Sequence, residues 1–320
     1  MKQRFLLALS LSFLGLAAQA AEPYPTRPVT LVVGYPPGGS ADSAARLLSE
    51  RLAPLLGQPV IVDNRPGAAG NLAAELVARA PANGYTLLFG SSSLATNPFV
   101  YDKLRYNIRK DFVPVSTVVS LPLLISVTPS LPVTNLKDWV ALARSKPGEF
   151  SYGTSGNGSL GHLTMEGFKQ SQHLNVVHVP YKGSAPMLTG LMGGEIGVTF
   201  DATSSGLPLA KAGKIRALAV TSSRRLTGAP DVPTVAEAGF PDAKASGWYG
   251  VLSPAKTPPE IIDRLNAAIR KAMAAPGVAE TLQAQGVELD TSTPKAFADL
   301  ITQDLVRYER EVKLSGAKVE

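Results

Sequence analysis

Residues 29–56 narrow the choice of fold more than any other stretch of the chain. The run Val-Thr-Leu-Val-Val at 29–33 is β-branched and apolar without polar alternation, which predicts a strand buried on both faces. From Ala41 to Leu56 apolar side chains recur at helical spacing and predict a helix with one covered face. A loop rich in glycine and proline joins the two. The stretch therefore predicts a strand–loop–helix unit, the building block of an α/β fold.

Strand and helix patterns continue to alternate beyond this unit. Strands are predicted at 60–62, 85–89, 176–181, 196–200, 215–220 and 248–252, and the chain from 258 to about 314 is predicted to be mainly helical. Repeated strand–helix–strand units predict mostly parallel sheets with helices on their faces. The long apolar run 112–127, interrupted by Pro114 and Pro122, is predicted as two strand segments. We further predict Thr134 as a helix cap and residues 203–205 as a loop.

This pattern predicts two α/β lobes. Residues 21–121 and 246–320 are assigned to the first lobe and residues 122–245 to the second, with the chain crossing near 120–122 and 244–247. Ligands of open parallel sheets bind beyond the carboxyl ends of the strands. Two facing lobes would therefore place their ligand between them.

The first twenty residues have the pattern of an export signal. Lys2 and Arg4 precede an apolar run at 5–16, and Ala-Gln-Ala at 18–20 is a typical cleavage site. The apolar run is too short to span a bilayer. We expect cleavage near Ala20 and a soluble protein in the periplasm, with a retained N-terminal anchor as the alternative.

Composition excludes several classes of function. The 320 residues include no cysteine, so disulfides, cysteine-bound metals and thiol catalysis are absent. A chain of this length buries roughly three quarters of its unfolded surface and needs no covalent cross-links. The formal net charge is +6, but lysines and arginines are scattered, which argues against a nucleic-acid or membrane patch.

Two loops have the design of an anion site. In residues 34–40, which we call the first loop, Gly38 and Gly39 allow a ligand to approach the backbone closely. The helix that follows presents unpaired N–H groups at its partly positive end. Residues 151–162 repeat the order of strand, glycine- and hydroxyl-rich loop and helix start; we call residues 155–159 the second loop. Either loop could instead be a plain strand-to-helix turn.

Other motifs are weaker. Gly156-x-Gly158-x-x-Gly161 matches a dinucleotide fingerprint, but no acidic residue ends the following strand. The three histidines have no metal-binding spacing, and no Gly-x-Ser-x-Gly elbow occurs. A hydrolase that uses His162 with a nearby serine stays open, because a catalytic triad is defined by geometry rather than spacing.

Two aspartates are ambiguous. Asp42 could cap its own helix or contact a ligand. Asp201, predicted at a strand end, could accept a hydrogen bond from a ligand amine or a bridging water, or could be a solvated carboxylate without a role.

The ordered set of motifs resembles the tripartite tricarboxylate transporter receptors, also called Bug receptors. The resemblance covers essentially the whole chain after the export signal, with Tyr35 as a small departure where these receptors often carry phenylalanine. It rests on seven stretches: 24–33, 36–42, 62–70, 83–87, 152–159, 179–183 and 211–219. It implies a type II-like, two-lobed α/β periplasmic binding protein, each lobe a mostly parallel sheet flanked by helices.

The resemblance also implies a function and a site. The protein would capture a small mono-, di- or tricarboxylate, gripped by backbone N–H groups and waters, and deliver it to a membrane permease; a ligand-presenting sensor is the alternative. We expect a monomer without catalytic residues, metal, cofactor or nucleic-acid partner. The predicted ligand-binding residues are Tyr35, Gly38, Gly39, Ser40, Asp42, Ser91, Asn97, Ser155, Gly156, Gly158, Ser159, His162, Tyr181, Lys182 and Asp201.

Overall fold

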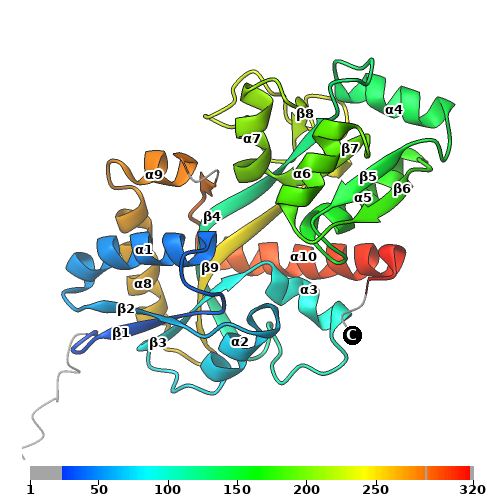
Figure 1. The fold of residues 1–320 in the computed structure, drawn as a ribbon. Coiled ribbons are helices and arrows are strands. Elements are labelled where there is room, and N and C mark those ends of the chain that lie inside the picture. Colours follow the sequence, from blue (N-terminus) through cyan, green and yellow to red (C-terminus); the bar gives the residue numbers. More distant parts are fainter. Residues whose placement is uncertain (1–23, 285–286, 318–320) are drawn as a thin grey trace, which may run out of the picture.

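The computed structural model describes residues 24–284 and 287–317, so the predicted export signal lies outside the described residues (Figure 1). The strands are β1 (Val29–Val33), β2 (Val60–Asn64), β3 (Thr86–Ser91), β4 (Phe112–Val127), β5 (Ser151–Thr154), β6 (Val177–Pro180), β7 (Val198–Ala202), β8 (Arg216–Val220), β9 (Ser246–Pro254) and β10 (Glu288–Leu289). The α-helices are α1 (Ser40–Leu56), α2 (Asn71–Ala78), α3 (Ser93–Val100), α4 (Leu136–Ser145), α5 (Leu160–Gln172), α6 (Ser184–Gly193), α7 (Thr203–Lys211), α8 (Pro259–Met273), α9 (Val278–Ala284) and α10 (Pro294–Ser315). In this part of the chain, no helix is both long and apolar enough to cross a membrane.

The strands form one curled, mixed sheet in the order β2-β1-β3-β9-β4-β7-β5-β6, with β8 and β10 paired to β4. The outer strands are parallel, β1 with β2 and β3, and β5 with β6 and β7. The two inner strands, β4 and β9, run antiparallel to each other and to their other neighbours. The predicted α/β class is confirmed, and its parallel strand–helix units lie at the two ends of the sheet.

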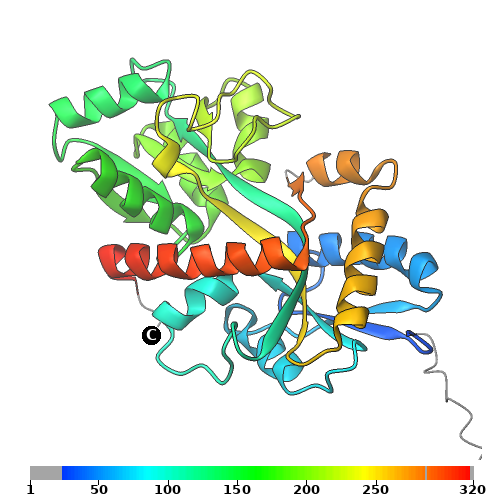
Figure 2. The same cartoon turned by 180° about the vertical axis from the view of Figure 1, so that it is seen from behind.

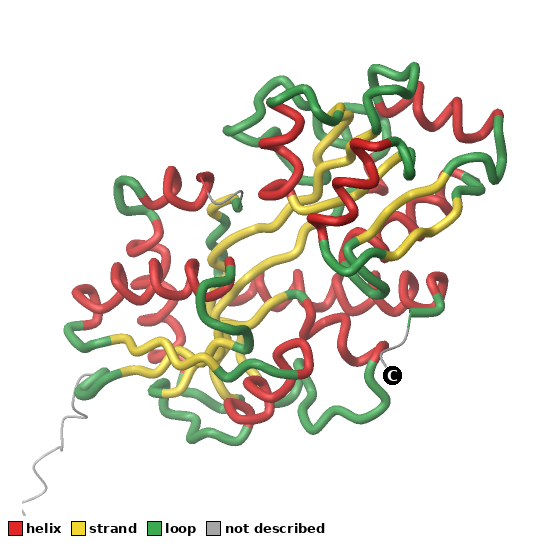
Figure 3. The backbone as a smooth tube through the Cα atoms, viewed as in Figure 1, coloured by secondary structure: helices red, strands yellow, loops and turns green. Residues whose placement is uncertain are grey.

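The prediction of two strand segments at 112–127 is wrong, because β4 is one strand that passes through both halves of the sheet (Figure 3). Pro114 lies next to a register shift in the pairing with β9. Pro122 lies where β4 leaves β9 and begins to pair with β7 at Leu123. Proline lacks the N–H of a regular ladder, so it is tolerated at such irregular positions.

Two lobes extend from this shared centre. We call β1–β3 with α1–α3 and α8 the first lobe, and β5–β8 with α4–α7 the second lobe. In the first lobe α1 and α8 share one apolar core with β1, while α2 and α3 belong to another. In the second lobe α4 and α5 pack in a core separate from those around α6 and α7. Each lobe therefore has cores on more than one face of the sheet.

Two local predictions need correction. The cap of α4 is Asn135 rather than Thr134, because the Asn135 side chain accepts a hydrogen bond from the backbone N–H of Asp138. Residues 203–205 are the first turn of α7 and not a loop. Both corrections move a helix start by only a few positions, where sequence patterns are least informative.

Helix α10 runs along both lobes (Figure 2). It packs on α3 in the first lobe and on α5 in the second. Leu163 of α5 lies in the same apolar core as Leu305 and Tyr308 of α10. The indole N–H of Trp248, at the start of β9, donates to Asp304 Oδ2 over 2.8 Å. Helix α10 therefore packs against both lobes. The assignment of residues 246–320 to the first lobe stays a prediction.

Gly161, in the first turn of α5, allows this helix to approach β7 closely. A Cβ at this position would lie 2.0 Å from the backbone oxygen of Phe200. The last glycine of the dinucleotide-like motif therefore has a packing role that needs no nucleotide.

We expect Gly161→Ala to lower the free energy of unfolding by about 2 kcal/mol or more, because the new methyl group overpacks against rigid backbone. Gly193→Ala is the matched control, since Gly193 also lies in a helix and its Cβ would meet nothing within 4 Å. Urea denaturation of both variants measures the difference. Equal stability of the two variants would contradict the close approach.

A second buried feature of α10 is the carboxyl group of Glu311. The residue is 4% exposed, and its Oε1 would lie 3.3 Å from a Cβ placed on Gly167 of α5. Glu311 Oε2 has no hydrogen-bond partner among the described residues. Burial raises the pKa of Glu311 from 4.5 to about 7, against the opposing effect of Arg307 and Arg310.

Glu311 should make stability fall as pH rises. The folded protein holds this proton to higher pH than the unfolded chain, so the stability present below about pH 4.5 is lost as pH rises to about 7. We expect Glu311→Gln, which cannot ionise, to show a smaller loss over this range than the wild type. Urea midpoints at pH 5, 6, 7 and 8 measure it, and identical slopes for the two proteins would refute the assignment.

Candidate functional site

A cleft of about 360 Å³ separates the second loop from the first lobe. On one side it is lined by residues 155–160, and on the other mainly by the chain at the start of α3, including Ser93 and Asn97. Five of the predicted site residues line it: Asn97, Ser155, Gly156, Gly158 and Ser159. The second loop connects β5 to α5, so the N-terminal turn of α5 lies directly behind it.

Hydrogen bonds within the second loop hold its shape. Gly158 has a φ of +73°, and its N–H donates to Nδ1 of His162 over 3.1 Å. Ser159 is the N-cap of α5, and its Oγ accepts from the backbone N–H of His162 over 3.3 Å. The N–H groups of Gly156 and Ser159 are also paired, with Thr154 Oγ1 and with the backbone oxygen of Gly156, so the loop can offer a ligand only its other donors.

His162 is buried and belongs to a stack of three rings next to the second loop. Its ring lies 4.1 Å from that of His178, with the planes within 12°, and Tyr152 stacks on the other face of His178 at 4.8 Å. His178 Nε2 is 2.7 Å from Oγ1 of Thr154, at the end of β5. Burial lowers the pKa of both histidines, that of His178 to about 4, so both rings are neutral near pH 7.

This geometry counts against a hydrolase. A general base needs a free ring nitrogen within reach of the nucleophile. Nδ1 of His162 already accepts the Gly158 N–H, and the side chain is 4% exposed. In this arrangement His162 accepts a hydrogen bond that holds the second loop, and its Nδ1 is not free to act as a general base.

The first loop lines a separate hollow of about 370 Å³, together with Tyr249 of β9. Its members include Tyr35, Gly39 and Ser40. The hydroxyl of Tyr35 lies 2.6 Å from Ser91 Oγ and 2.9 Å from Ser93 Oγ. Ser40 Oγ lies 2.9 Å from the hydroxyl of Tyr249. The two tyrosines thus tie the first loop to β3, α3 and β9, while Gly38, Gly39 and Ser40 remain exposed.

Asp42 has a structural role. One carboxylate oxygen accepts from the N–H of Gly38 at 3.0 Å and from Nε of Arg46 at 2.9 Å. The other accepts from Nδ2 of Asn64 at 2.9 Å. The hydrogen bond from Arg46 lowers the pKa of Asp42 to about 2, so the side chain is a carboxylate at neutral pH.

The remaining predicted residues lie outside both hollows or serve other contacts. Asn97 donates to Oδ1 of Asn71 over 2.6 Å, although it also lines the cleft. Tyr181 donates to Glu195 over 3.4 Å, and Lys182 is exposed.

Asp201, at the end of β7, is buried beneath the start of α6. It accepts from Ser184 Oγ over 2.6 Å. Burial raises its pKa, and Oδ2 has no hydrogen-bond partner in the described part of the chain.

The two loops do not line one cavity in this structure. The second loop lines a cleft with the start of α3, whereas the first loop lines a separate hollow with Tyr249. The expectation that both loops share a single cleft is therefore not met in this arrangement of the lobes.

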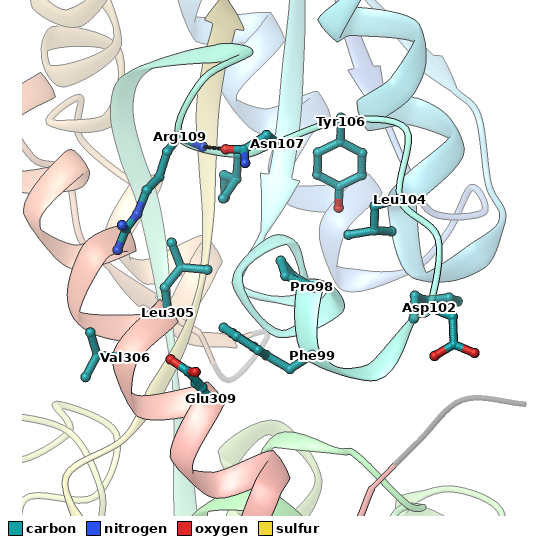
Figure 4. A pocket seen from close by; sticks show the side chains of 12 residues that line it. Pro98, Phe99, Asp102, Leu104, Tyr106, Asn107, Arg109, Leu305, Val306 and Glu309 are labelled. Carbon is teal, nitrogen blue, oxygen red and sulfur yellow. Dashed lines mark hydrogen bonds between the residues drawn. The ribbon is translucent and has the colours of Figure 1, made fainter.

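A further cavity, of about 400 Å³, lies between α10 and the chain that follows α3 (Figure 4). Its lining combines apolar side chains such as Phe99 and Leu305 with the exposed Arg109 and Glu309. No predicted site residue lines it. It also lies away from the carboxyl ends of the parallel strands, so we do not assign the ligand to it.

The sequence prediction missed several supporting residues. Asn64, Ser93, His178 and Tyr249 hold the predicted loops through hydrogen bonds and ring stacking. Ser93 belongs to a serine run directly after β3, which is the signal that could have identified it. Tyr249 is 209 residues from Ser40, so only the folded chain brings them together. Within the described residues no group of three histidine, aspartate or glutamate side chains could hold a metal ion.

The chain is similar to known proteins over most of its length. Residues 44–316 match the model of the tripartite tricarboxylate transporter family receptor. The protein BugT of Bordetella pertussis is 38% identical over 309 residues, which are 96% of this chain and 95% of BugT.

Two solved structures are also similar. Rpa4515 of R. palustris with adipate has a TM-score of 0.73 at 40% identity, over 92% of this chain and all of that one. A TctC solute binding protein from Polaromonas, solved without ligand, has a TM-score of 0.83 at 29% identity, over 91% and 99% of the two chains.

We expect Tyr249→Phe to lower the free energy of unfolding by about 1 kcal/mol, because it removes the hydrogen bond to Ser40 and keeps the ring. Tyr101→Phe is the control, since it removes the hydroxyl of another partly exposed tyrosine. Thermal unfolding compares the two. A loss in Tyr101→Phe as large as in Tyr249→Phe would speak against the contact.

Proposed function

The chain belongs to the tripartite tricarboxylate transporter receptor family, and on this premise we propose that it is a periplasmic solute-binding receptor for a small carboxylate. Its family and fold are those of solute-binding receptors. The observation that carries the proposal is the pair of glycine-rich loops, one in each lobe, each placed between the carboxyl end of a parallel strand and the N-terminus of a helix. Export to the periplasm is part of this proposal, supported by the family and by the predicted signal at residues 1–20.

The proposed grip on the ligand uses backbone donors. The first N–H groups of α1 and α5 have no acceptor within their own helix. A carboxylate placed there gains roughly 0.3–2 kcal/mol from each helix dipole, and more when water is excluded. Ser40 and Ser155 would add hydroxyl donors at the edges of the two loops.

We propose that the ligand brings the two loops together. The structure is more similar to the Polaromonas protein without ligand, at a TM-score of 0.83, than to the adipate complex, at 0.73, although the adipate protein is closer in sequence. This difference supports the interpretation that the loops line separate hollows because the lobes are open. Closure about β4 and β9 would then place the ligand between both loops.

We further propose that the closed receptor delivers its ligand to a membrane permease. The support is the family description, which names receptors of a tripartite transporter. The acid itself is to be identified by experiment, and the adipate bound to the R. palustris protein makes a dicarboxylate of similar length the first compound to test.

The decisive experiment is a thermal-shift screen of protein from residue 21 onward, unfolded and refolded to remove carried-over ligand. The panel contains adipate and shorter dicarboxylates, citrate, acidic amino acids and aromatic acids. We expect one group of acids to raise the melting temperature by several degrees, since binding to the folded state alone stabilises it. No shift with any acid at millimolar concentration would refute the receptor proposal.

A variant tests whether the first loop contacts the ligand. Gly39 is the N-cap of α1, with a φ of −81° that any residue tolerates, and its Cβ would lie 3.8 Å from the nearest atom. In Gly39→Asn the new side chain can bond the same N–H groups that the ligand would use. We therefore expect unchanged or higher stability together with at least tenfold weaker binding of the best acid in the screen. Binding equal to the wild type would remove the first loop from the site.

A further inference from the structure

A polar contact outside the candidate site links the two lobes. Nη2 of Arg224 donates to the backbone oxygen of Leu289 over 3.3 Å. Arg224 follows β8, and Leu226, two residues further on, is buried in a core of the second lobe. Leu289 lies in β10, and Val287, just before this strand, is buried in the core that α1 and α8 share. The contact therefore joins a segment fixed to the second lobe with a segment fixed to the first.

Two carboxyl groups flank the acceptor of this contact. Glu288 and Asp290 lie on either side of Leu289, and side chains two residues apart in an extended chain share one face. Burial raises the pKa of both carboxyl groups, and the positive charge of Arg224 opposes this by lowering both. The charge of Arg224 thus reinforces its hydrogen bond to Leu289. We call Arg224 together with residues 288–290 the rear contact.

The rear contact lies behind the strands that join the lobes. Ser223 and Asp290, which adjoin the two partners, line a cavity of about 340 Å³ together with Trp248. Trp248 and Tyr249 are consecutive residues of β9, so their side chains lie on opposite faces of the sheet. Tyr249 lines the hollow of the first loop, whereas Trp248 bonds to α10, which lies toward the viewer in Figure 2. The rear contact and the first loop are therefore on opposite faces of the sheet.

Bending about β4 and β9 has opposite effects on these two faces. When the second loop moves toward the first loop on one face, the parts of the two lobes on the other face move apart. The rear contact spans the lobes on that other face, and the distance from Arg224 Nη2 to its acceptor is already 3.3 Å. A further separation of an ångström exceeds the reach of a hydrogen bond. Closure therefore breaks the rear contact.

We propose that the rear contact holds the lobes apart, and that Arg224 is a positioning residue that sets the affinity of the receptor without touching its ligand. The inference rests on the proposed function, because it takes closure about β4 and β9 as the step that completes the site. A contact made only in the open arrangement lowers the closed population. The affinity for a ligand that binds the closed form falls by the same factor. In the ligand-free receptor the rear contact thus keeps the site accessible.

The test measures closure without any ligand. The chain contains no cysteine, so Ser40→Cys and Ser155→Cys can be introduced as reporters, one in each loop. A short bis-maleimide joins them only while the loops are close, so the rate of joining follows the closed population even where that population is small. Arg224→Met removes the charge and the donor but keeps an unbranched apolar stem. At pH 8 we expect joining about threefold faster in this variant, the effect of losing one exposed charged contact.

The neighbouring arginine provides a matched control. Arg225 donates to the Glu237 carboxylate and to the backbone oxygen of Pro230, both on the same stretch between β8 and β9 as Arg225 itself. Arg225→Met removes the same charge from the protein but breaks no contact between the lobes, so the rate of joining should stay unchanged. A threefold rise in Arg225→Met, or no rise in Arg224→Met, would overturn the proposal.

Charge reversal enlarges the effect. Arg224→Glu places a carboxylate beside Glu288 and Asp290, and we expect joining about tenfold faster, with most of the gain over Arg224→Met lost at high salt because exposed charges are screened. Adding Glu288→Arg to Arg224→Glu restores an attraction between the two segments and should return the rate toward that of the wild type. If this second change fails to slow the joining, Arg224 does not act through β10 and the proposal is overturned.

Binding separates this inference from the proposed function. Arg224→Met without the reporters is titrated with the acid of the panel that gives the largest thermal shift, and we expect about threefold tighter binding than in the wild type. Wild-type affinity would contradict the inference and leave the receptor function standing. No thermal shift with any acid, in the wild type and in Arg224→Met alike, would instead refute the receptor function, and the rates of joining still decide whether the rear contact holds the lobes apart.

Discussion

The antiparallel pairing of β4 with β9 is the contact on which the rest of the structure depends. It extends from Phe112 opposite Pro254 to Pro122 opposite Ser246, and it joins the parallel strands of one lobe to those of the other. Because both strands are continuous, the two lobes share one sheet and are not joined by a flexible linker. Helix α10 reinforces this centre by packing on α3 and α5. Any movement of the lobes must therefore be a bend within paired strands, which favours a small number of defined arrangements.

On this frame the two loops of the candidate site are built from backbone geometry rather than from charged side chains. Each follows a parallel strand, turns through a glycine of positive φ and enters a helix whose first N–H groups have no intrahelical acceptor. Several of their side chains are engaged in contacts within the protein: the Asp42 carboxylate bonds Arg46 and Asn64, and the Tyr35 hydroxyl bonds Ser91 and Ser93. A site of this kind suits ligands that share a carboxylate but differ in the remainder, because backbone donors recognise the shared group.

Buried ionisable groups also lie on α10, outside the two loops. Asp304, Arg307 and Glu311 follow one another along the face of α10 that is packed inside the protein, and burial raises the pKa of both carboxyl groups. Trp248, at the start of β9, bonds to Asp304. A carboxyl group with a pKa of about 7, that of Glu311, thus lies where α10 meets the two lobes. In the two loops, the Asp42 carboxylate is paired with Arg46, and burial lowers the pKa of His162. Changes in pH should therefore act on the contact between the lobes before they act on the loops.

The sequence by itself determined the strand–loop–helix units. Apolar β-branched runs such as 29–33 and the helical spacing of apolar residues at 41–56 are local patterns that can be recognised without the structure. It also singled out Gly38, Gly39 and residues 155–159, because glycines between a strand and a helix start let a ligand approach the backbone closely. Only the tertiary structure decided that β4 is one strand, that Asp42 and His162 accept the N–H of Gly38 and Gly158, and that Tyr249 reaches Ser40 from 209 residues away. The reason is that a hydrogen-bond partner depends on strand register and on the packing of distant segments. Neither can be predicted from the spacing of residue types along the chain.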